Sequence, residues 1–198
     1  MAIANYHLIL ASNSPRRKEL LTGIDIEYEI RTLPDIEETY TNDTPPEKVA
    51  EYLALKKTTA YLPQLKDNEL LITADTVVLL NNKVYGKPMD NAEAKRMLRE
   101  LSGQTHRVIT GVCLTSTKKQ VAFSDTTRVT FTELSEEEIE YYVERYSPLD
   151  KAGAYGVQEW IGYVAVKHIE GSYFNVMGLP IHRVYEELKS SFGFRVAG

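Results

Sequence analysis

The chain has 198 residues, of which 43% are hydrophobic and 26% charged, and its net charge is −5. This length allows a proper hydrophobic core in one domain, or in one domain with two lobes. The acidic balance argues against non-specific binding to nucleic acid or anionic membranes, which needs a broad basic surface, but it permits a local basic pocket.

Targeting and metal-binding patterns are sparse. No apolar stretch approaches the roughly 18 residues of a membrane span, and the start Met-Ala-Ile-Ala-Asn-Tyr-His lacks a basic segment followed by an apolar one. We therefore expect a cytoplasmic protein with neither a membrane nor a nucleic-acid partner. The single cysteine, Cys113, excludes an internal disulfide and a cysteine-rich zinc site. The four histidines are scattered, so a metal is expected to be a hard cation held by oxygens.

Apolar periodicity alternates between strand and helix along the first half of the chain. The expected elements are a strand at 8–10, a helix at 15–21, a strand at 27–33, a helix at 46–62, and a strand at 70–80 that turns at Asn81 and Asn82 into a strand at 83–85.

The second half continues this alternation. The expected elements are a helix from Asp90 or Asn91 to 101, strands at 107–115 and 121–131, a helix from the Ser135–Glu138 capping box to 145, an irregular stretch at 148–162, a strand at 163–169 and a helix at 180–190. Together these elements predict an α/β fold, with a mixed sheet and helices on its faces, in a single domain over residues 1–198.

The helix expected at 15–21 begins with an unusual charge pattern. Ser14 is a good N-cap and Pro15 suits the first helical position. A helix built only for stability would carry acids in its first turn, but this one carries Arg16, Arg17 and Lys18. Free amides, the helix dipole and guanidinium groups then all favour one anion, such as a phosphate. The alternative is a solvated basic turn on a surface helix.

Asp75 interrupts the most apolar segment of the chain. Burying a carboxylate costs several kcal/mol unless it is paired, hydrogen-bonded or bound to a metal, so an acid at this position indicates a function. The alternative is a structural aspartate satisfied by backbone amides at the end of a strand.

Three further segments add polar groups. Asp35, Glu37 and Glu38 form an acidic cluster, Lys87 lies in a Gly-Lys-Pro turn, and a glycine-rich loop at 150–158 ends in Gln158. Taken singly, these segments are equally compatible with solvated or flexible loops. Combined with the cationic helix start and Asp75, they indicate a metal-dependent enzyme acting on phosphates, without identifying the bond that is broken or the base that is recognised.

In its motifs the chain resembles the Maf family of nucleoside triphosphate pyrophosphatases. The matching motifs are Leu10-Ala-Ser-Asn-Ser-Pro-Arg-Arg17, Asp35-Ile-Glu-Glu38, Ala74-Asp-Thr-Val-Val78, Gly86-Lys-Pro88, Leu101-Ser-Gly-Gln-Thr-His106, Asp150-Lys-Ala-Gly-Ala-Tyr-Gly-Val-Gln158 and Gly178-Leu-Pro180. The resemblance implies a two-lobed α/β fold with the nucleotide in a cleft between the lobes. It also implies hydrolysis between the α and β phosphates with a divalent cation, Mg²⁺ or Mn²⁺.

The same resemblance implies roles for individual residues. Asp75 is the expected base and, with Lys87, forms the catalytic pair. Glu38 and Asp75 are expected to face the metal. The residues expected to bind substrate are Ser14, Arg16, Arg17, Lys57, Thr76 and Gln158, with Ser14, Arg17, Lys57 and Lys87 on the phosphates. Lys57 is chosen over its neighbour Lys56 by its place in the family's pattern.

Three positions indicate the substrate. Arg16, Thr76 and Gln158 match the branch that prefers dTTP and UTP and is expected to accept modified pyrimidine triphosphates, whereas the 7-methylguanosine triphosphate branch has Trp, Gln and Glu there. An amide and a guanidinium can pair with the imide edge of thymine or uracil. The alternatives are a 7-methylguanosine or inosine-type triphosphate pyrophosphatase, or a nucleotide-binding regulator of cell division with little turnover. A homodimer is left open.

Overall fold

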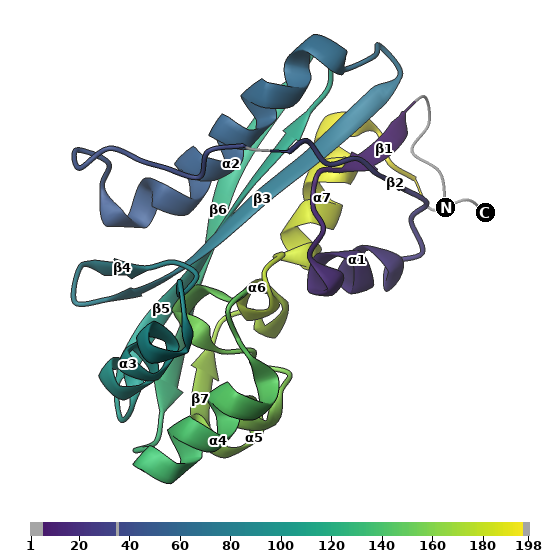
Figure 1. The fold of residues 1–198 in the computed structure, drawn as a ribbon. Helices are drawn as coiled ribbons and strands as arrows, with labels where there is room; N and C mark the ends of the chain where they lie inside the picture. Colours follow the sequence, from purple (N-terminus) through teal and green to yellow (C-terminus); the bar gives the residue numbers. More distant parts are fainter. Residues whose placement is uncertain (1–5, 35, 196–198) are drawn as a thin grey trace. The chain divides into compact units, whose positions relative to one another are not determined.

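The structure is a computed structural model that describes residues 6–34 and 36–195 (Figure 1). Its contacts divide the chain into two compact units. The first comprises the residues up to Asp75, Thr110–Asp125 and the residues from Gly178 onward, and the second comprises Thr76–Ile109 and Thr126–Met177. Within the described ranges, no helix has both the length and the apolar character needed to cross a bilayer.

The elements follow the expected alternation. The first unit contains β1 (His7–Leu10), α1 (Pro15–Thr22), β2 (Glu29–Ile30), α2 (Val49–Tyr61) and α7 (Ile181–Phe192), with 3₁₀ turns at Pro46–Lys48 and Leu62–Gln64. The second contains β4 (Lys83–Tyr85), α3 (Asn91–Leu101), α4 (Glu136–Tyr146), a 3₁₀ turn at Ala152–Ala154, α5 (Trp160–Ala165), β7 (Val166–Glu170) and α6 (Tyr173–Met177). Three long strands, β3 (Glu69–Leu80), β5 (Thr105–Thr115) and β6 (Gln120–Phe131), contribute residues to both units.

These strands form one seven-stranded sheet. The order is β2-β1-β3-β5-β6-β7, and β4 pairs with β3 outside this path. β1 runs parallel to β2 and β3, whereas the β3–β4 and β6–β7 pairs are antiparallel. The mixed α/β sheet expected from the sequence is therefore confirmed.

In the first unit, α2 approaches β5 at a glycine. A Cβ atom built on Gly111 would lie only 2.3 Å from the backbone of Ala50, so nothing larger than glycine fits without moving the helix. Cys113 on the same strand is fully buried, with its sulfur 3.2 Å from the Thr115 hydroxyl, in agreement with a packing role.

In the second unit, the predicted turn chemistry is confirmed. Asn81 and Asn82 both have positive φ angles, 49° and 63°, as a two-residue hairpin between β3 and β4 requires (Figure 1). Asp90 caps α3, and Ser135 and Glu138 form both hydrogen bonds of the capping box that starts α4.

The predicted strand at 163–169 is wrong in its first half. Residues 163–165 belong to α5, and only Val166–Glu170 forms β7. The Gly162 amide donates to the Glu159 carbonyl at 2.9 Å, and a Gly162 Cβ would lie 1.8 Å from the Val157 carbonyl oxygen. This close approach requires glycine, and a helix begins here in place of the strand that the alternation indicates.

Two other elements also differ from the expectation. The strand expected at 27–33 pairs only over Glu29–Ile30, and α6 was not expected. Beyond Ile30 the Arg31 amide still donates to the Leu10 carbonyl at 3.1 Å. After that, side chains hold the chain: the Leu33 amide donates to the Tyr61 hydroxyl at 3.0 Å, and Leu33 packs on a cluster of Ile9, Tyr61 and Leu71. Such long-range contacts leave no local pattern in the sequence.

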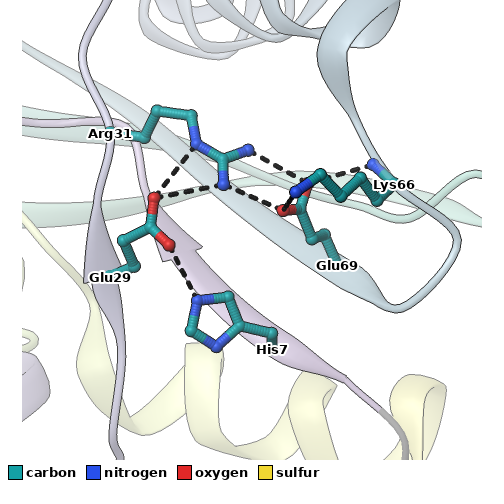
Figure 2. Close-up of polar contacts among 5 residues, drawn as sticks. All are labelled: His7, Glu29, Arg31, Lys66 and Glu69. Atoms are coloured by element: carbon teal, nitrogen blue, oxygen red, sulfur yellow. Dashed lines mark hydrogen bonds and ion pairs between the residues drawn. The ribbon is translucent and has the colours of Figure 1, made fainter.

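A polar network ties the short strand β2 to its neighbours (Figure 2). Glu69, at the start of β3, is 3% exposed, and both its oxygens accept from the Arg31 guanidinium, at 2.8 and 3.0 Å. Arg31 also donates to Glu29, which lies 2.9 Å from the His7 ring. The pairing with Arg31 lowers the pKa of Glu69 from its ordinary 4.5 to about 2.

This lowered pKa predicts acid sensitivity. A carboxylate whose pKa is depressed by folding stabilises the protein above its unfolded pKa, and that stability is lost as the pH falls from 4.5 towards 2. Glu69→Gln should therefore lose less stability than the parent between about pH 6 and about pH 3, by about 2 kcal/mol. Denaturant unfolding at both pH values measures this difference. Parallel losses in parent and variant would contradict it.

Candidate functional site

The start of α1 forms as predicted. Ser14 is the N-cap, its hydroxyl accepts from the Arg17 amide, and Pro15 occupies the first helical position. The first turn carries no acid. The loop before it is also ordered by side chains, because the Ser14 amide donates to the Ser12 hydroxyl at 3.2 Å. The helix therefore presents amides and the half-buried Arg16 and Arg17 at one end, as an anion site requires.

Arg17 joins three segments of the first unit. Its Nε donates to the Gly178 carbonyl at 2.8 Å, and its Nη1 donates to the Ala74 carbonyl at 3.0 Å. Nη1 also lies 3.4 Å from the Ser12 hydroxyl. Burial lowers the pKa of Arg17, and the nearby Asp75 partly offsets this effect. Lysine could not replace this planar group, since a single ammonium cannot hold both carbonyls in the same fork.

Lys57 stands between the two acids that the resemblance assigns to a metal. Its Nζ lies 2.5 Å from Asp75 Oδ1 and 2.9 Å from Glu38 Oε1, and it also approaches the Ala74 carbonyl at 3.4 Å. The side chains of Lys57 and Asp75 are only 12% and 10% exposed. Arg17 and Lys57 thus share the Ala74 carbonyl, which brings four of the predicted site residues together at one point of β3.

The backbone explains why these groups meet there. β1 runs parallel to β3 with Leu10 opposite Ile72, and the Ala11 amide donates to the Ile72 carbonyl at 2.9 Å. The carboxyl end of β1 therefore lies beside β3 just before Ala74. Ligands of α/β sheets commonly bind outside the carboxyl ends of parallel strands.

The neighbouring lysine has a different task. Lys56 Nζ donates to the hydroxyl and the carbonyl of Thr39, at 2.8 and 3.0 Å, and lies 3.7 Å from Glu37. Lys56 therefore holds the acidic segment from outside, whereas Lys57 contacts Glu38 and Asp75. This difference supports Lys57 over Lys56 as the site residue.

Glu38 and Asp75 fit a divalent cation whose remaining ligands come from the phosphates of a nucleotide. Glu38 and Asp75 converge on one cationic position, now taken by the Lys57 ammonium. Mg²⁺ is typically held by one or two carboxylates, with water and substrate phosphates completing its shell. Within residues 6–34 and 36–195, no group of three or more His, Cys, Asp or Glu side chains could hold a metal. Asp35, the first acid of the predicted cluster, lies outside these ranges.

Three predicted site residues belong to the second unit: Thr76, Lys87 and Gln158. Thr76 is half-buried in β3, and Lys87 is exposed just after β4. A backbone hydrogen bond of 3.0 Å from the Gly153 amide to the Gly86 carbonyl links the turn of Lys87 to the loop of Gln158. Gly153 has a φ of 67°, and a Cβ there would lie 2.8 Å from Val78, so this link depends on glycine.

Gln158 has an unusual environment. Its carbonyl oxygen is buried and has no hydrogen-bond partner among the described residues. Native proteins rarely leave buried polar atoms in this state, and such an atom commonly awaits a ligand or water. A donor such as the imide N–H of a pyrimidine base would satisfy it.

His106 and Tyr155 anchor the same loop from inside. The His106 ring lies 2.8 Å from the Tyr155 hydroxyl, and both side chains are buried. Burial lowers the pKa of His106 to about 4, so its ring is neutral around pH 7. The sequence did not single out this pair, and neither did it indicate that Ser12 and the carbonyls of Ala74 and Gly178 would hold Arg17.

Comparison with known proteins supports a family assignment. Residues 7–191 match the family model described as Maf-like protein. A dTTP/UTP pyrophosphatase of Phocaeicola vulgatus is 57% identical over 187 residues, which cover 94% of this chain and 97% of the relative. A dTTP/UTP pyrophosphatase of Porphyromonas gingivalis is 55% identical over 94% of this chain and 95% of its own length.

A solved structure has a similar fold. The Ham1 protein of Staphylococcus aureus superposes with a TM-score of 0.53 at 17% sequence identity, covering 91% of this chain and 99% of that one. This likeness concerns the fold alone.

Proposed function

The chain belongs to the Maf-like protein family, and on that premise we propose that it is a pyrophosphatase that hydrolyses dTTP and UTP to the monophosphate and pyrophosphate. Two relatives that each cover 94% of the chain carry the name of this activity. The observation that carries the proposal is the convergence of Arg17, Lys57, Glu38 and Asp75 on the Ala74 segment of β3. This hydrolysis requires cations that neutralise the phosphate oxygens. It also requires carboxylates that hold a metal and accept a proton from water.

In the proposed reaction, the cationic residues bind the triphosphate. The amides that Ser14 orders at the start of α1, the Arg17 guanidinium and the Lys57 ammonium neutralise its oxygens, and Lys87 adds a further cation. Asp75 takes a proton from water as the water attacks the α-phosphorus, and pyrophosphate leaves. Glu38 and Asp75 would hold Mg²⁺ or Mn²⁺, which when bound neutralises charge on the phosphate oxygens.

Base selection is assigned to Gln158, with Arg16 and Thr76. The buried carbonyl oxygen of Gln158 lacks a donor, and thymine and uracil present an imide N–H between two carbonyls. A 7-methylguanine is cationic and would favour a carboxylate and a stacking aromatic instead. The proposal extends to modified pyrimidine triphosphates that keep the imide edge. The expected cytoplasmic location stays a prediction, and a homodimer is left open.

A panel of nucleoside triphosphates tests the proposal. We expect turnover of dTTP and UTP with Mg²⁺ or Mn²⁺, pyrophosphate rather than phosphate as the product, and no turnover in a chelator. Faster hydrolysis of inosine or 7-methylguanosine triphosphate would overturn the substrate assignment. Nucleotide binding without turnover would instead favour a regulatory role.

Gln158→Glu tests base selection directly. The change replaces an amide donor with a negative, acceptor-only group beside the carbonyls of the base. It should cost about 1–3 kcal/mol in transition-state binding of dTTP and UTP. Activity on 7-methylguanosine triphosphate should fall less, or rise. The measurement is kcat/KM for both substrates in parent and variant, and an unchanged ratio would remove Gln158 from the specificity residues.

A further inference from the structure

The turn that carries Gln158 is closed by its own backbone. The Glu159 amide donates to the Gly156 carbonyl at 3.0 Å, so residues 156–159 form a four-residue turn with Gln158 in its third position. The Gly162 amide then donates to the Glu159 carbonyl at 2.9 Å. Glu159 thus ends the turn and leads into α5.

One buried hydroxyl holds both ends of this turn. Tyr142 on α4 is fully buried, and its hydroxyl accepts from the Gly156 amide at 3.0 Å while it donates to the Glu159 carboxylate. Burial and the adjacent carboxylate raise the pKa of Tyr142, so the hydroxyl keeps its proton at neutral pH. A single side chain outside the loop therefore fixes the first and the last residue of the turn.

A second contact holds the Glu159 carboxylate from another side. Lys151 is 7% exposed, and its ammonium lies 3.1 Å from Glu159 Oε1 and 2.7 Å from Asp150 Oδ1. A buried ammonium is costly without paired carboxylates, so this contact constrains Glu159 as well as Lys151. Both oxygens of Glu159 are therefore engaged, and the carboxylate is held in one position.

We infer that Tyr142 and Glu159 are positioning residues for base selection: they hold the turn so that the unpartnered oxygen of Gln158 faces the imide N–H of uracil or thymine. This inference rests on the proposed function. Neither side chain touches the base. Their effect acts through the turn, because a hydrogen bond in a site of this kind discriminates between substrates only when its acceptor is held in place.

The test compares UTP with CTP, which share the ribose and the triphosphate but differ at the base edge that Gln158 would read. Tyr142→Phe keeps the ring and removes the hydroxyl. We expect it to lower the ratio of kcat/KM for UTP to that for CTP by about tenfold, mainly through KM for UTP. The ratio is measured within one preparation, so any loss of folded protein cancels.

Tyr146→Phe is the matched control. Tyr146 lies one turn further along α4, stacked on Tyr142 with ring centroids 5.1 Å apart. The Tyr146→Phe variant should leave the UTP-to-CTP ratio of kcat/KM unchanged. Glu159→Ala is the second variant, used if Tyr142→Phe does not fold, and it should lower the ratio in the same way. A folded Tyr142→Phe or Glu159→Ala protein that discriminates as the parent does would overturn the inference. A parent that does not prefer UTP to CTP would instead overturn the proposed base selection, and the inference with it.

Discussion

Asp75→Asn is expected to lower kcat for dTTP and UTP by about 100-fold or more, while nucleotide affinity changes by only a few-fold. The amide keeps the shape of the carboxylate and still offers an oxygen to Lys57, which lies 2.5 Å away in the parent, but it cannot take a proton from water. General-base catalysis typically contributes about 10²–10⁴-fold, which sets this estimate.

The two effects are measured separately. Single-turnover kinetics report the chemical step, and calorimetric titration with a UTP analogue that carries a non-hydrolysable α–β bridge reports binding. Asp67→Asn is the matched control, because Asp67 lies in the same unit and its carboxylate accepts an exposed hydrogen bond from Thr117. Asp75→Asn turnover within a few-fold of the parent would rule out Asp75 as the base.

Local chemistry made part of this molecule predictable. The Ser14 cap, the Asn81–Asn82 turn and the Ser135–Glu138 capping box are each set by residues within three positions of one another, and all three form as expected. The buried position of Asp75 was also readable, since one acid in an apolar run stands out against its neighbours. These features need no knowledge of the rest of the chain.

Contacts between residues far apart in the sequence were not predictable in the same way. Arg17 donates to the Gly178 carbonyl, 161 residues away in sequence, and nothing in the sequence around either residue predicts that hydrogen bond. The helix at 160–165 was missed for a local reason, because a strand-like alternation concealed the close fit of Gly162 against Val157. The hydrogen bonds between the Tyr142 hydroxyl and both ends of the Gln158 turn were likewise not predictable from the sequence. The sequence therefore indicated candidate site residues, but it did not predict the contacts that hold them in place.

Gly111→Ala is expected to destabilise the first unit by about 3 kcal/mol or more, enough to reduce the yield of folded protein. A Cβ at this position would lie 2.3 Å from the Ala50 carbonyl carbon and oxygen and from the Glu51 amide nitrogen. These are backbone atoms of α2, so no side chain can rotate away and the whole helix must shift. Overpacking a well-filled core commonly costs about 1–3 kcal/mol even when side chains can adjust.

The same shift should weaken the site, because α2 carries Lys57 and the contact to Asp75 depends on its position. Gly23→Ala is the control: Gly23 ends α1 with a φ of −64°, and an added Cβ would meet its neighbours at 3.4 Å or more. That change should be neutral or stabilise slightly, since alanine restricts the unfolded chain. Denaturant unfolding of both variants measures the difference. If Gly111→Ala were as stable as Gly23→Ala, α2 could not be packed against β5 as closely as the structure has it.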